Sequence, residues 1–189
     1  MRTLFYSVLT LLAACSGPAS QPPATQVPLP VVLHVTPTPR PLPAHATTYI
    51  QQHFPDWYIC SQDDYDDAFG SFYDTTTHPW YVEVDINDDQ QGDYGVLIRN
   101  QHQVKVLFLV GEDSSFTHWL APNISLPFNA ANPRLQHGLF PEPPGQIDVA
   151  YPSLQSLVLH TNGVSLVHLE NRICLYYKDS TGIAIFKTR

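Results

Sequence analysis

One stretch of the sequence has oxygen-bearing side chains at a spacing that can surround a cation. Asp85, Asn87, Asp89 and Asp93 stand at positions one, three, five and nine of a single loop. Calcium takes six to eight oxygen ligands, and alternate residues of a tight loop point toward a common centre. The backbone carbonyl of Gln91 is placed to supply a further oxygen. We therefore expect these five residues to form a calcium site.

Two positions of this loop depart from the usual calcium pattern. Gln90 stands at position six, where glycine normally allows the sharp turn, and a non-glycine residue in the left-handed conformation costs about 1 kcal/mol. Val96 stands at position twelve, so a further ligand has to come from Glu83 or from an acid within 63–67. The alternative is an acidic hairpin loop without metal. Crowded carboxylates and carboxamides favour the cation, because they would otherwise repel one another or stay unsatisfied.

Charge is distributed unevenly along the chain, whose formal net charge is −8. Eleven of its 17 acidic residues lie within 56–93, a stretch that contains no lysine or arginine. Such a surface attracts basic proteins and repels nucleic acid, so we expect no nucleic-acid partner. Aromatic residues are interleaved with the acids, as on many protein-binding faces. The expected face consists of Trp57, Tyr58, Asp63, Asp64, Tyr65, Asp66 and Asp67. The alternative is that the aromatic side chains fill the core.

Catalytic motifs are missing from the sequence. The nine histidines form neither an HxH nor an HExxH pattern, and there is no P-loop, dinucleotide fingerprint or nucleophile elbow. The acid pair Glu83 and Asp85 is compatible with glycoside chemistry, but acids at this spacing more often line loops or cation sites. We do not expect an enzyme.

Two cysteines remain beyond the first fifteen residues. Cys60 and Cys174 form an even pair, which in an oxidising compartment commonly becomes a disulfide. The bridge would close a loop of more than one hundred residues. In the chain-entropy model such a closure adds up to about 4 to 5 kcal/mol. We expect this disulfide, with two separately buried thiols as the alternative.

The first fifteen residues are typical of a secretory signal. Arg2 precedes an apolar run over 4–12, which is too short to span a bilayer as a stable helix and which leads into Leu-Ala-Ala-Cys15. This pattern resembles a bacterial lipoprotein signal, which implies removal of 1–14 and membrane attachment through a lipid on Cys15. A plain signal peptide is the alternative. Ser16 resembles the residue that sends lipoproteins to an outer membrane, so we expect a lipid-anchored envelope protein that faces the periplasm.

A proline-rich segment follows Cys15. Nine prolines lie within 16–44, separated mostly by small and polar residues. Proline fixes its own φ and restricts the residue before it, so this composition favours an extended, solvated spacer. We expect 15–44 to be the lipidated cysteine and its tether, with a short docked strand over 31–35 as an alternative. The remaining 45–189 has the size of one domain.

This domain has the pattern of an antiparallel β fold. Thr47 or Thr48 is the expected cap of a short helix that ends before Pro55. Asn162-Gly163 and 180–182 predict hairpin turns, and the proline-rich 121–152 predicts a long irregular excursion. Expected strands cover 57–61, 80–86, 94–99, 104–110, 116–120, 157–160, 164–170, 172–178 and 182–187. The expected fold class is mainly β: an antiparallel meander, sandwich-like or incomplete-propeller-like, with one short N-terminal helix.

The segment 84–96, VDINDDQQGDYGV, resembles the calcium loop of FG-GAP-like repeats, which also occurs in single copy in bacterial envelope lipoproteins and periplasmic proteins. The run 164–186, with two tyrosines and a glycine between apolar strands, resembles the end of these single-copy domains. Some of these relatives are immunity proteins that inhibit lysozyme-like effectors. The resemblance implies a β-rich domain with an inhibitory loop, and a calcium ion bound by Asp85, Asn87, Asp89 and Asp93.

Two functions are compatible with these expectations. The first is a membrane-anchored binding module that blocks a basic peptidoglycan hydrolase with its acidic, aromatic face. The second is a structural or accessory envelope lipoprotein without inhibitory activity, whose calcium braces a loop. The first requires the acidic stretch to be exposed, and the second expects it to be folded back on the domain.

Overall fold

The computed structural model describes residues 41–72, 78–122, 125–150, 153–169 and 171–188. The chain divides into the units Met1–Thr36 and Pro37–Arg189, and every described residue belongs to the second unit. The predicted signal peptide over 1–14, the predicted lipidation site Cys15, the strand over 31–35 that was the alternative to a linker, and the tether up to residue 40 lie outside the described residues.

Three short helices lie in the first part of the described chain. The helix α1 covers Ala44–His53, the 3-10 helix η1 covers Gln62–Asp64, and the helix α2 covers Asp67–Phe72. The predicted cap is wrong, because α1 begins before both threonines and has Pro43 at its N-cap. The Thr48 hydroxyl instead donates to the Ala44 carbonyl at 2.9 Å within the helix.

Strands account for most of the remaining chain, which confirms the mainly β class. The first half contains β1 (Tyr58–Ile59), β2 (Tyr81–Val84), β3 (Asp93–Arg99), β4 (Gln103–Glu112), β5 (Ser115–Leu120) and β6 (Leu126–Pro127). The second half contains β7 (His137–Glu142), β8 (Gly145–Val149), β9 (Gln155–Leu159), β10 (Gly163–His168), β11 (Asn171–Asp179) and β12 (Gly182–Lys187).

Antiparallel pairing arranges these strands in three sheets. The six-stranded sheet has the order β1-β3-β4-β5, with β2 also paired to β3 and β6 to β4. The four-stranded sheet has the order β12-β11-β10-β7, and β8 pairs with β9 alone. Neighbours in sequence are mostly neighbours in a sheet, as expected for a meander. The exceptions are β1, which pairs with β3, β6, which pairs with β4, and β7, which pairs with β10.

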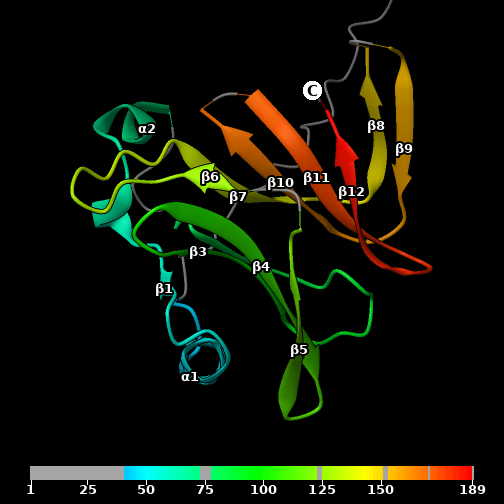
Figure 1. Cartoon of the computed structure of the whole chain (residues 1–189). Helices are drawn as coiled ribbons and strands as arrows, with labels where there is room; N and C mark the ends of the chain where they lie inside the picture. Colours follow the sequence, from blue (N-terminus) through cyan, green and yellow to red (C-terminus); the bar gives the residue numbers. More distant parts are fainter. Residues whose placement is uncertain (1–40, 73–77, 123–124, 151–152, 170, 189) are drawn as a thin grey trace, which may run out of the picture. The chain divides into compact units, whose positions relative to one another are not determined.

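The main core lies between the six-stranded and four-stranded sheets, as in a sandwich. Phe108 of β4 and Tyr176 of β11 are both fully buried, and their ring centroids lie 5.0 Å apart. The other face of the six-stranded sheet packs against α1 through Ala46 and Ile50. Figure 1 shows α1 and the four-stranded sheet on opposite sides of β4. Burial of these apolar faces is the main source of stability for such a layered fold.

The prediction for 121–152 is wrong, because this stretch contains β6, β7 and β8. The prediction took the prolines of this stretch as a sign of loop. Proline is tolerated in an edge strand, and Pro141 lies in β7 at the edge of the four-stranded sheet. Asn162-Gly163 is not a hairpin turn either, because β9 pairs with β8 and β10 pairs with β7. The turn before β12 is confirmed, since Asp179 pairs with Gly182, whose φ is +140°.

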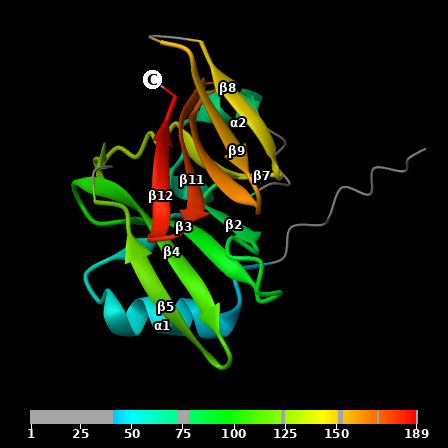
Figure 2. The same ribbon diagram turned by 90° about the vertical axis from the view of Figure 1, so that its right-hand side faces the viewer.

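The strands β8 and β9 extend the β7–β10 pair beyond the four-stranded sheet. Glu142 pairs with Gly163 at the end of one pair, and Gly145 with Leu159 at the start of the next. The resulting two-stranded ribbon is visible in Figures 1 and 2. Two large apolar side chains are strongly exposed here: Val158 of β9 at 54%, and Leu154 directly before β9 at 78%.

Candidate functional site

The strand β3 places the two groups of predicted site residues at its opposite ends. Its first residue, Asp93, pairs with Val84 and borders the 85–92 loop, whereas its last, Arg99, pairs with Tyr58 close to η1. Seven residues of extended chain, the length of β3, span about 20 Å. The described acidic residues of 56–93 therefore do not form one face, as the sequence predicted, but are divided between the two ends of β3.

The 85–92 loop is held by carboxylates that accept hydrogen bonds from its own backbone. The Asp85 carboxylate accepts the N–H of Asp89 at 3.1 Å and that of Gln90 at 2.9 Å. The Asp89 carboxylate accepts the N–H of Gln91 and the side-chain amide of Asn87, both at 2.8 Å. The sequence argument that these groups need a cation to be satisfied is wrong for this loop, because its N–H donors satisfy them.

The loop turns at two residues with a left-handed backbone. Asp88 has a φ of +62° and Gln90 a φ of +67°. The sharp turn at position six of the calcium pattern is therefore present despite the absence of glycine there. At position 88 an aspartate tolerates this conformation better than most residues do. At position 90 the hydrogen bond from the Gln90 N–H to Asp85 offsets part of the backbone strain of Gln90.

Asp93 is the most deeply buried of the predicted calcium ligands. Its Oδ2 accepts the N–H of Ile86 and its Oδ1 the N–H of Gly111, both at 2.8 Å. Burial raises the pKa of this carboxyl above its ordinary value of 3.8, and the two N–H donors oppose that rise. Within the described ranges no group of three or more histidine, cysteine, aspartate or glutamate side chains is arranged to hold a metal ion. Calcium binding stays a prediction.

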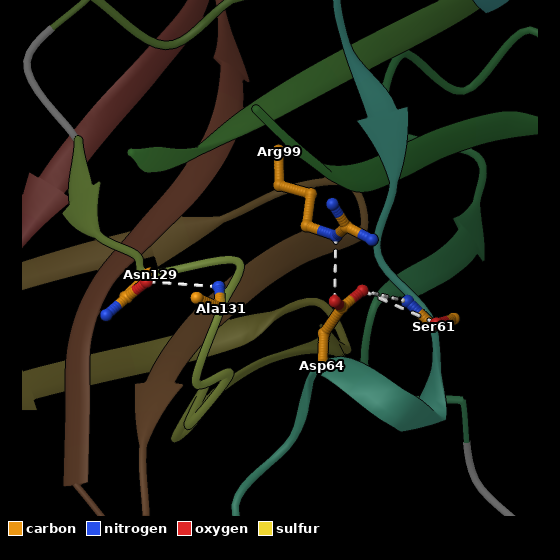
Figure 3. Close-up of polar contacts among 5 residues, drawn as sticks. All are labelled: Ser61, Asp64, Arg99, Asn129 and Ala131. Atoms are coloured by element: carbon orange, nitrogen blue, oxygen red, sulfur yellow. Dashed lines mark hydrogen bonds and ion pairs between the residues drawn. The ribbon is translucent and has the colours of Figure 1, made fainter. Parts of the chain in front are cut away.

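At the other end of β3, an ion pair organises the chain around Arg99. The Arg99 Nε lies 2.8 Å from Asp64 Oδ1, and the side chains are 25% and 5% exposed. The other oxygen of Asp64 accepts the backbone N–H of Ser61 at 2.9 Å, which fixes the start of η1. Figure 3 shows the Asp64 carboxylate between Arg99 and Ser61. Breaking such a half-buried pair from one side leaves a charge without a partner, which is more costly than losing a surface ion pair.

The predicted partner-binding face is only partly exposed. Asp64 and Tyr65 are buried at 3% and 8% exposure, so the prediction is wrong for these two residues. The ion pair with Arg99 holds the Asp64 carboxylate in its buried position, and Tyr65 packs on Phe69 with ring centroids 4.9 Å apart. Trp57 and Asp66 are half-buried. Tyr58, Asp63 and Asp67 are exposed, as the prediction requires.

Two cations of the six-stranded sheet lie over the aromatic residues of this region. The Arg99 guanidinium lies 5.6 Å from the Tyr58 ring centroid and 5.4 Å from that of Phe128. The Lys105 ammonium lies 5.4 Å from the Trp57 ring centroid. These distances are within the range of cation–π contacts. Tyr58 is nevertheless 62% exposed. Its ring is therefore positioned by Arg99 and remains available to a partner.

A pocket of about 300 Å³ with a mixed polar and apolar lining lies beyond Phe128, and the sequence did not predict it. Its lining residues are His102, Pro127, Phe128, Asn129, Asn132 and Arg134. They come from the β3–β4 turn, from the end of β6 and from the chain after it, which the pairing of Gln103 with Pro127 brings together. One signal was available, because Arg134 is the only lysine or arginine between Lys105 and Arg172.

The two cysteines are free and buried in the structure, in place of the predicted disulfide. Cys60 follows β1 and donates its N–H to Leu97 in the six-stranded sheet, whereas Cys174 lies in β11 of the four-stranded sheet. Burial raises the pKa of the Cys60 thiol, and it raises that of Cys174 to about 11. Both thiols therefore stay protonated near neutral pH, and each contributes to the main core as a small apolar side chain.

No family model, no curated protein and no solved structure matches the chain. No helix in the described ranges combines the length and the apolar character needed to cross a bilayer. Function is therefore inferred from the residues and geometry above.

Proposed function

We propose that the chain is a membrane-tethered envelope lipoprotein whose β domain binds a basic protein, in the sharpest form a peptidoglycan hydrolase that it inhibits. The observation that carries this proposal is Tyr58, a large aromatic side chain that is 62% exposed. Exposed tyrosines on a rigid frame are common anchors of protein interfaces.

The frame behind Tyr58 supports this role. Arg99 contacts the tyrosine ring, and Asp64 holds Arg99 by an ion pair at 2.8 Å. The tyrosine backbone is fixed by its pairing with Arg99 in the sheet. A side chain that is already ordered loses less conformational entropy on binding, so it contributes more of its contact energy to affinity.

Charge supports a basic partner. Asp56, Asp63 and Asp67 are exposed near Tyr58 in the chain, and within the described ranges none of them lies in an ion pair. The whole chain carries a formal net charge of −8. Such a surface accelerates the association of a cationic protein and makes its binding sensitive to salt.

The proposal keeps the predicted anchor and the predicted calcium. Lipid on Cys15 would hold the domain at the membrane, most simply the outer membrane facing the periplasm. Calcium would brace the 85–92 loop through side-chain oxygens of Asp85, Asn87 and Asp89 and the carbonyl of Gln91. Asp93 would support the ion only indirectly, because its side chain is fully buried and both its oxygens accept backbone N–H groups.

A second candidate is a structural or accessory envelope lipoprotein without inhibitory activity. It is favoured by the burial of Asp64 and Tyr65 and by the carboxylates of the 85–92 loop, which are satisfied within the loop. These features are what an acidic stretch folded back on the domain would show.

Binding to a panel of purified basic lysozyme-like hydrolases separates the two candidates. We expect one member to bind the purified chain and to lose activity, and Tyr58→Ala to weaken that binding by about tenfold or more. The control is Leu154→Ala, which removes a large apolar side chain that is 78% exposed and lies directly before β9. Absence of binding across the panel, or equal effects of both substitutions, would favour the accessory function.

A further inference from the structure

The pocket beyond Phe128 has a rigid wall on the side of the β3–β4 turn. The Asn100 side chain accepts the N–H of His102 at 2.9 Å and that of Gln103 at 3.0 Å, which closes the turn. Phe128 then donates its N–H to the His102 carbonyl at 2.9 Å. These bonds hold His102 and Phe128 in fixed positions at the pocket, although the two residues are 26 positions apart in the sequence.

A turn at 129–132 supplies two further lining residues, Asn129 and Asn132, which carry amide groups. The Asn129 carbonyl accepts the N–H of Asn132 at 3.0 Å, and its side-chain oxygen accepts the N–H of Ala131 at 3.0 Å. Figure 3 shows this side-chain bond from Asn129 to Ala131. Because the oxygen of Asn129 is engaged, its NH₂ group is left as the free, donating end of the side chain.

The polar side chains of the pocket are rich in donors, and none is acidic. No hydrogen bond or ion pair engages the side chains of His102, Asn132 or Arg134 in the part of the chain that the structure describes. Arg134 stands out because the chain has 17 acidic residues, and none of the described ones lies within ion-pair distance of it. By contrast, a second pocket of about 200 Å³ beside the 85–92 loop is lined by Asp113.

We infer that the pocket beyond Phe128 binds a small carboxylate-bearing ligand. A guanidinium binds a carboxylate through two parallel N–H bonds, and the imidazole and amide groups supply further donors around it. Phe128 provides an apolar wall for the body of the ligand, with Arg99 on its ring. In the envelope such a carboxylate occurs on an acidic sugar or at the end of a peptide. The choice of these two ligand sources rests on the proposed envelope location, whereas the carboxylate chemistry does not depend on the hydrolase partner proposed above.

Three probes test the carboxylate and distinguish its source. N-acetylmuramic acid and N-acetylglucosamine differ by the lactyl carboxylate, and N-acetylalanine carries a carboxylate without a sugar. Each is titrated into the purified chain while the side-chain amide signals of Asn129 and Asn132 are followed by NMR. We expect N-acetylmuramic acid to shift both signals and N-acetylglucosamine to bind at least about tenfold more weakly, because a charge-assisted hydrogen bond is lost.

The variant Arg134→Gln removes the charge and keeps a side chain of similar length. It should weaken the binding of N-acetylmuramic acid by about tenfold or more. The control Lys178→Gln, at an exposed site on β11, should leave this binding unchanged. Binding of N-acetylalanine as tight as that of the acidic sugar assigns the pocket to peptide ends, and weaker binding assigns it to the sugar. Equal binding of the two sugars, no shift with any acid, or an unchanged Arg134→Gln variant would overturn the inference.

Discussion

A pair of histidines makes the stability of the domain depend on pH. His137 of β7 lies opposite His168 of β10, and their ring centroids are 4.7 Å apart. Burial lowers the pKa of His137 from 6.5 to about 4, and the neighbouring His168 adds to this effect. His168 lies 3.1 Å from the Gln136 side chain, which contacts Asp66 at 3.4 Å. The Asp66 carboxylate is therefore linked to this pair only through the Gln136 amide.

The free-energy change follows from the two pKa values of His137. Well above pH 6.5 the imidazole is neutral in the folded and unfolded states, so its titration does not reduce the free energy of unfolding. Between 6.5 and about 4 the unfolded chain binds a proton that the folded chain excludes, so stability falls as the pH falls. The loss is about 2 kcal/mol at about pH 5 and approaches about 3 kcal/mol at lower pH.

Urea unfolding at a series of pH values measures this loss. The variant His137→Gln should lose about 2 kcal/mol less stability than the natural chain between about pH 7.5 and about pH 5. The control His160→Gln, at an exposed position, should keep the natural slope. The raised pKa of Asp93 acts in the opposite direction and is common to all three proteins, so it cancels in the comparison. Parallel slopes for His137→Gln and the natural chain would refute the reasoning.

Two further predictions concern packing and the loop. Gly138→Ala should lower the free energy of unfolding by about 1–3 kcal/mol, because the added Cβ would lie 2.8 Å from the Phe69 ring. Gly145→Ala, where no atom lies within 4 Å of the added Cβ, should change it by less than about 0.5 kcal/mol; a similar loss in both variants would contradict the contact argument. Calorimetric titration of calcium into the chelator-treated chain should give heat that Asp89→Ala abolishes. Absence of heat in the natural chain would remove calcium from the proposed function.

The sequence predicted the strands that have an unambiguous apolar pattern. The apolar residues of β3 and β4 place both strands within two residues of the predicted 94–99 and 104–110. It failed for β6 to β8, because proline at a sheet edge resembles proline in a loop. It also treated Asn162-Gly163 as a hairpin, since local turn propensity carries no information on which strands pair across the fold.

The candidate sites show the same division between local and distant information. The 85–92 loop was located correctly because its residues are consecutive. The burial of Asp64 was not foreseen, because its partner Arg99 lies 35 positions further along the chain. The pocket beyond Phe128 was missed for a related reason, since the pairing of β4 with β6 brings its two walls together. Such contacts depend on strand register, which local sequence does not determine.

The two hydrogen bonds of Asp93 have a consequence for tracing relatives of this chain. Both donors are backbone N–H groups, so neither bond requires a particular side chain at its donor residue. Gly111 is constrained for another reason, because a Cβ there would lie 3.0 Å from the Gly92 carbonyl oxygen. A diverged homologue can therefore replace Ile86 and still keep both bonds of Asp93. The signature to search for is an aspartate followed 18 residues later by a glycine, at the positions of Asp93 and Gly111.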